Sequence, residues 1–76
     1  MDIWEKCENV KTKNDFIMFV ESLRSDLNTN EVEWENVTLE AYLEAMKAWM
    51  TDTDRLSDSP SWKDFAVILL SGRFYE

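Results

Sequence analysis

Apolar residues recur at intervals of three and four in three stretches of the chain, and this period predicts three helices. The first stripe consists of Phe16, Phe19, Val20, Leu23 and Leu27. A capping box from Thr12 to Asp15 precedes it and predicts a helix over about 13–27. The segment 28–30 is expected to end this helix, because Asn tolerates the left-handed conformation found beyond helix ends. Met18 falls on the opposite face.

The second stripe predicts a helix over about 39–51, with Thr38 as its N-cap. The stripe consists of Leu39, Tyr42, Leu43, Met46, Trp49 and Met50. Ala41, Ala45 and Ala48 lie beside it, where small side chains allow another helix to approach closely. We therefore expect this helix to pack tightly against a neighbour.

The third stripe is wider than the other two. It consists of Trp62, Phe65, Ala66, Ile68, Leu69 and Leu70. The helix either follows Ser59, with Pro60 in its first turn, or follows a second capping box at Ser61, and it ends near residue 74. A buried strand over 65–70 is the competing interpretation. So wide an apolar arc predicts a helix at the centre of the fold or one covered by a partner.

The remaining segments are less periodic. Residues 1–11 predict a short helix or an arm that packs Trp4 onto the domain. Residues 31–37 alternate like a strand but lack a partner strand, so we expect an extended connector anchored by Val32 and Trp34, its glutamates facing solvent.

The pattern as a whole predicts one all-α domain over residues 1–76. It is a compact three-helix domain with a short N-terminal helix or arm before it. Residues 51–61 form a polar loop, and the aromatic rings of the 72–76 tail are expected to pack back onto the domain.

Composition restricts the function more than the fold. The 76 residues include 16 acidic and 8 basic side chains, a formal net charge of −8. This charge disfavours nucleic acid, where binding depends on cations that neutralise phosphates, and it disfavours anionic membranes. It favours attraction to a basic protein surface.

Catalytic chemistry is not expected. The chain has no His and a single Gly, which excludes His-based triads and Gly-rich phosphate loops. Cys7, the only cysteine, lacks a cationic His neighbour that would activate it and is expected to be a partly buried structural thiol. Glu40 and Glu44 lie one turn apart, but on a predicted solvent face. We therefore predict a protein that is not an enzyme and carries no cofactor.

One acidic segment invites comparison with a calcium loop. Asp52 and Asp54 match the first two ligand positions of an EF-hand loop. The later positions do not match: Leu56 stands where an oxygen ligand is required, Ser57 where Gly is required and Lys63 where Glu is required. We expect a solvated acidic loop and no metal site.

Targeting signals are also missing from the sequence. The N-terminus lacks a basic region followed by an apolar run, and the longest apolar run, 65–70, is far short of a bilayer span of about 20 residues. A cytoplasmic protein that is a monomer or a weak homodimer is expected. Asn36 and Thr38 match a glycosylation acceptor, but a helix cap at Thr38 explains the pattern better.

Several segments together resemble a family of short, uncharacterised bacterial and phage domains. They are WENVTLEAYLEAMKAW at 34–49, FIMFVESLRSDL at 16–27, SWKDFA at 61–66 and YE at 75–76. The resemblance implies no activity. Small acidic domains of this kind resemble toxin-immunity proteins and phage inhibitors of host defence in size and charge.

We therefore predict a non-catalytic domain that binds a protein partner with a basic surface and occludes it, as an immunity or anti-defence inhibitor would. The predicted partner-binding residues are Glu31, Glu33, Trp34, Glu35, Asp52, Asp54 and Asp58. The Trp residues are expected mainly to pack in the core. The alternative is an exposed apolar anchor, because Trp is enriched at interface centres, and Trp34, with an anionic rim from Glu33 and Glu35, is the best single candidate for it. Both acidic groups flank the second helix and are expected to reach one surface. The alternative is a self-associating structural subunit that buries the wide face of the third helix.

Overall fold

The computed structural model describes residues 2–75; Met1 and Glu76, at the ends of the expected N-terminal segment and tail, lie outside them. The order is α1 (Ile3–Glu8), α2 (Lys13–Asn30), the 3₁₀ turn η1 (Glu31–Glu33), α3 (Leu39–Asp52) and α4 (Trp62–Phe74). Residues 2–75 contain no strand, which confirms the all-α class. The strand interpretation of 65–70 is wrong, because these residues lie within α4.

Side-chain caps start each helix. The hydroxyls of Thr12 and Thr38 accept from backbone N–H groups at the starts of α2 and α3, as predicted. Ser61 and Asp64 form a reciprocal capping box at the start of α4. Pro60 therefore lies before the cap, and the alternative start after Ser59 is not used. Asp2 caps α1 in the same way.

Helix α2 continues three residues beyond its predicted end. The amide of Asn30 donates to Asp26 Oδ1 at 2.9 Å, and the Thr29 hydroxyl donates to the Ser25 carbonyl at 3.0 Å. Both contacts span one helical turn and hold the last residues in the helix. No residue from 2 to 75 has a positive φ, so the left-handed cap expected at 28–30 does not form.

The connector between α2 and α3 is only partly as expected. It begins with η1 instead of an extended segment, and Trp34 N donates to the Glu31 carbonyl at 3.0 Å. Val32 is 97% exposed, so its predicted role as an anchor is wrong. Trp34 is 9% exposed and is the residue that anchors the connector.

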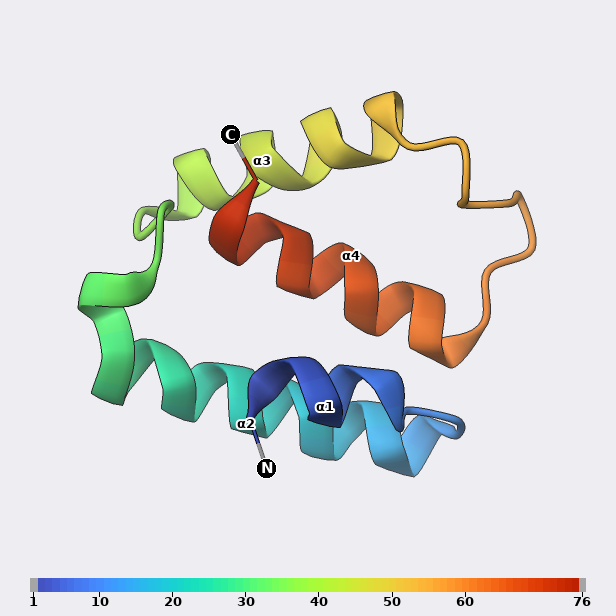
Figure 1. The fold of residues 1–76 in the computed structure, drawn as a ribbon, viewed down its shortest axis with the longest axis horizontal. Coiled ribbons are helices and arrows are strands. Elements are labelled where there is room, and N and C mark those ends of the chain that lie inside the picture. The colour runs from blue at the N-terminus through green and yellow to red at the C-terminus, as the bar shows by residue number, and fades with distance from the viewer. Residues whose placement is uncertain (1, 76) are drawn as a thin grey trace.

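Helix α4 is the centre of the fold. It lies between α2 and α3 in Figure 1 and contacts α1, α2 and α3, whereas α2 and α3 do not contact each other within residues 2–75. The buried residues of α4 are Ala66, Leu70, Ser71, Gly72 and Arg73. The wide apolar arc is therefore only partly covered within the chain, since Trp62 and Phe65 in the first turn of the helix stay exposed.

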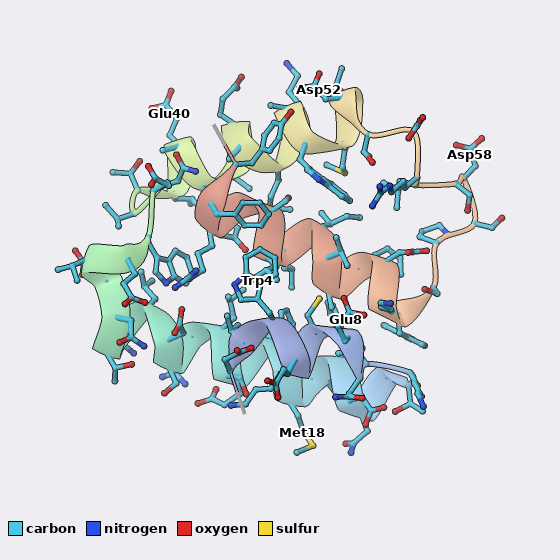
Figure 2. All side chains as sticks on the ribbon, viewed as in Figure 1. Trp4, Glu8, Met18, Glu40, Asp52 and Asp58 are labelled. Atoms are coloured by element: carbon cyan, nitrogen blue, oxygen red, sulfur yellow. The ribbon has the colours of Figure 1, made fainter. Side chains whose placement is uncertain are left out.

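Helix α1 covers one side of the α2–α4 pair. Cys7 and Val10 are buried in the core, and burial raises the pKa of the Cys7 thiol to about 11, as expected for a structural thiol. Trp4 reaches from α1 toward α4 (Figure 2) and packs on Phe74 with ring centroids 4.9 Å apart. Lys63 of α4 pairs with Glu8 at 2.9 Å. Of the two N-terminal alternatives, the short helix is confirmed.

Gly72 of α4 lies directly against the Tyr42 ring of α3. A Cβ atom at this position would lie 2.6 Å from the Tyr42 ring, so only Gly fits without a shift. The Tyr42 hydroxyl donates to the Leu69 carbonyl in the preceding turn of α4. Further along, the hydroxyl of Tyr75 donates to Asp52, which holds the chain end against the last turn of α3.

The variant Gly72→Ala tests the contact between Gly72 and Tyr42, because the contact decides whether the free energy of unfolding rises or falls. In an open helix the change stabilises by about 1 kcal/mol, because Ala loses less backbone entropy. Here we expect a loss of about 1–3 kcal/mol from overpacking against Tyr42, measured by urea denaturation. The loss should shrink in a Tyr42→Leu background. A stabilised single variant would contradict the contact.

Candidate functional site

The surface has two main depressions, one polar and one apolar. The polar depression, of about 710 Å³, lies among α1, α2, η1 and the end of α4. Lys6 Nζ lies 3.4 Å from the Ser22 hydroxyl, and Arg73 pairs with Asp26 at 2.9 Å. The lining is therefore mostly polar, and part of its charge is already paired within the chain.

Asp26 accepts three hydrogen bonds beside the polar depression. Its Oδ2 accepts from the Trp34 indole N–H at 2.8 Å and from Arg73 Nε at 2.9 Å, while Oδ1 accepts from Asn30. Burial alone would raise the pKa of this carboxyl. The hydrogen bonds from Asn30 and Trp34 and the charge of Arg73 outweigh burial and leave the pKa below its ordinary value.

Arg73 completes this cluster from the C-terminal end of α4. Its side chain is 11% exposed, its guanidinium lies 5.8 Å from the centroid of the Trp34 ring, and its Nη2 is 3.5 Å from Glu33. The cluster therefore ties α2, the connector and α4 together. Of the two alternatives for Trp34, the packing role is confirmed and the exposed anchor is wrong, because the indole N–H donates to Asp26 and the ring stacks on Tyr42.

The second depression, which we call the apolar groove, has a volume of about 410 Å³. Its apolar side chains are Val20, Leu23, Leu27, Val37, Leu39 and Leu69. They come from α2, the connector, α3 and α4, with the rings of Trp34 and Tyr42 adding to the lining. A groove lined in this way exposes apolar surface that a partner can cover.

The apolar groove is open because of how the helices are arranged. α2 and α3 both pack on α4 without meeting each other, so a channel remains between them. Val20 and Leu27 face this channel, whereas Ser22, Ser25 and Thr29 line the polar depression beside α1. Helix α1 therefore covers the other side of α2 and leaves the groove uncovered.

The most exposed apolar side chains of α3 lie at or near the groove: Leu39 lines it, and Leu43 lies outside its lining. Leu39 is 73% exposed and Leu43, one turn further, is 51% exposed. Both belong to the predicted apolar stripe of this helix, but they lie at its outer edge, beyond the contact with α4. The width of that stripe was the one sequence signal that could have marked them as surface residues.

The predicted acidic residues fall into two separate groups. Glu31, Glu33 and Glu35 are exposed beside the start of α3, as expected for the connector. Asp52 is the last residue of α3, and Asp54 and Asp58 lie in the loop that follows (Figure 2). The 14 residues of α3 separate the groups by about 21 Å at 1.5 Å per residue. They lie at opposite ends of this helix, and the expectation that they reach one surface stays a prediction.

Residues 12–76 match the model of a family described as Family of unknown function (DUF7660). Because the match covers most of the chain, the protein belongs to this family, and the resemblance to an uncharacterised family is confirmed. Neither a curated protein nor a solved structure matches the sequence.

Two further observations describe the chemistry available between residues 2 and 75. No helix in this part of the chain has the length and apolar character needed to cross a membrane. Across the same residues, no three His, Cys, Asp or Glu side chains gather closely enough to hold a metal ion.

The Asp26 cluster makes a prediction about pH. Folding lowers the pKa of Asp26, so the ionised carboxylate stabilises the folded protein. This contribution to the free energy of unfolding is complete above the pKa of Asp in the unfolded chain, about 4, and is lost as the pH falls through the lower pKa of Asp26 in the folded protein. Asp26→Asn should therefore lower the free energy of unfolding by about 2 kcal/mol at pH 7. The difference from wild type should shrink at pH 3.

Urea denaturation at the two pH values measures this effect. Glu21→Gln serves as the control, because Glu21 is exposed and pairs only with Arg24 of the same helix among the described contacts. Its effect should stay near zero at both pH values. An Asp26→Asn effect that is equally large at pH 3 would contradict the assignment.

Proposed function

We propose that this chain is a non-catalytic protein-binding domain that receives a partner in the apolar groove. The observation that carries the proposal is the open channel between α2 and α3, whose lining exposes Val20, Val37 and Leu39, with the exposed Leu43 one turn further along α3. Covering such side chains stabilises a complex by about 25 cal/mol per Å² of apolar surface removed from water.

The charge of the chain adds a preference for a basic partner. A net charge of −8 attracts cationic surfaces and raises the rate of encounter. Glu31, Glu33 and Glu35 lie at one end of α3 and Asp52, Asp54 and Asp58 at the other, so the proposed attraction acts along the length of this helix.

The proposed binding role suggests what the protein does in the cell. A small acidic domain that covers a basic functional surface acts as an inhibitor. We therefore include a bacterial or phage origin, a cytoplasmic site of action and an immunity or anti-defence role in the proposal. None of these has a residue-level signature of its own, so they depend on the identity of the partner.

Self-association is the second candidate, and exposed Leu39 and Leu43 are the observation in its favour. A symmetric dimer presents the same surface from both copies. Glu40 and Glu44, which neighbour these leucines on α3, would then meet the same acids of the other copy. We therefore prefer a foreign partner. A monomer by light scattering at micromolar concentration would contradict self-association.

Affinity capture with groove variants tests the preferred role. Leu39→Gln combined with Leu43→Gln replaces the two exposed leucines with residues that keep helix propensity. We expect the partner that wild type captures from its native cells to be lost, since two leucines contribute enough to change affinity about tenfold or more.

The matched control removes two exposed apolar side chains elsewhere. Met18 is 62% exposed on the outer side of α2 (Figure 2), and Val32 lies on η1. Met18→Gln combined with Val32→Gln should leave capture unchanged. Equal loss in both double variants, or no loss in either, would refute groove-dependent binding.

Salt and charge reversal test the electrostatic part separately. Glu31→Lys combined with Glu35→Lys should weaken binding of the captured partner, and the binding of wild type should weaken as salt rises. Glu33 is left unchanged, because it contacts Arg73 and its reversal would disturb the Asp26 cluster. Binding that is insensitive to both changes would contradict attraction by charge.

A further inference from the structure

We draw no further inference here: the strongest candidate, the exposed aromatic patch of Trp62 and Phe65 that packs on Phe16 where α2 and α4 begin, is an unpartnered apolar surface, and nothing in the structure shows what covers it.

Discussion

The carboxylate of Asp26 is the contact on which the arrangement of this molecule depends. It receives the Trp34 indole and the Arg73 guanidinium on one oxygen, and Asn30 on the other. These donors belong to the connector, the end of α4 and the last turn of α2. The burial of a Trp and an Arg in so small a domain is possible because one anion satisfies the polar groups of both.

The apolar groove is a consequence of this cluster. Trp34 is held against Asp26 on its polar edge and stacks on Tyr42, so the connector crosses from α2 to α3 at a fixed position. Asn36 strengthens that position by donating to the carbonyls of Gly72 and Tyr75. With its ends fixed in this way, α3 stands apart from α2 by the width of α4, and the space between them remains open.

The sequence predicted the parts of the fold that depend on near neighbours. Thr12, Thr38 and Ser61 are caps because each hydroxyl meets a backbone N–H only three residues ahead, a relation that a pattern can reveal. The end of α2 was predicted three residues short, because Asn was expected to end the helix, whereas Asn30 and Thr29 bond to the preceding turn. The sequence left Trp34 between a core role and a surface role, since the Asp26 carboxylate that binds its indole also depends on Arg73, 47 residues further along the chain.

The candidate site was less accessible to sequence reasoning for the same reason. Leu39 and Leu43 share a stripe with Tyr42 and Met46, and helical spacing does not distinguish the side chains that meet α4 from those at the edge. The acidic residues were identified by type, but their separation along α3 follows from that segment being one continuous helix. A surface made by three helices requires knowledge of their angles, which no local pattern contains.

The position of α1 has a consequence for variation within the family. The matched region begins at Thr12, the cap of α2, so α1 lies outside it although Cys7 and Val10 belong to the core. The segment that covers one side of the domain is thus separate in the chain from the residues that form the groove. A change in α1 is therefore expected to alter the stability of the domain more than the shape of the groove.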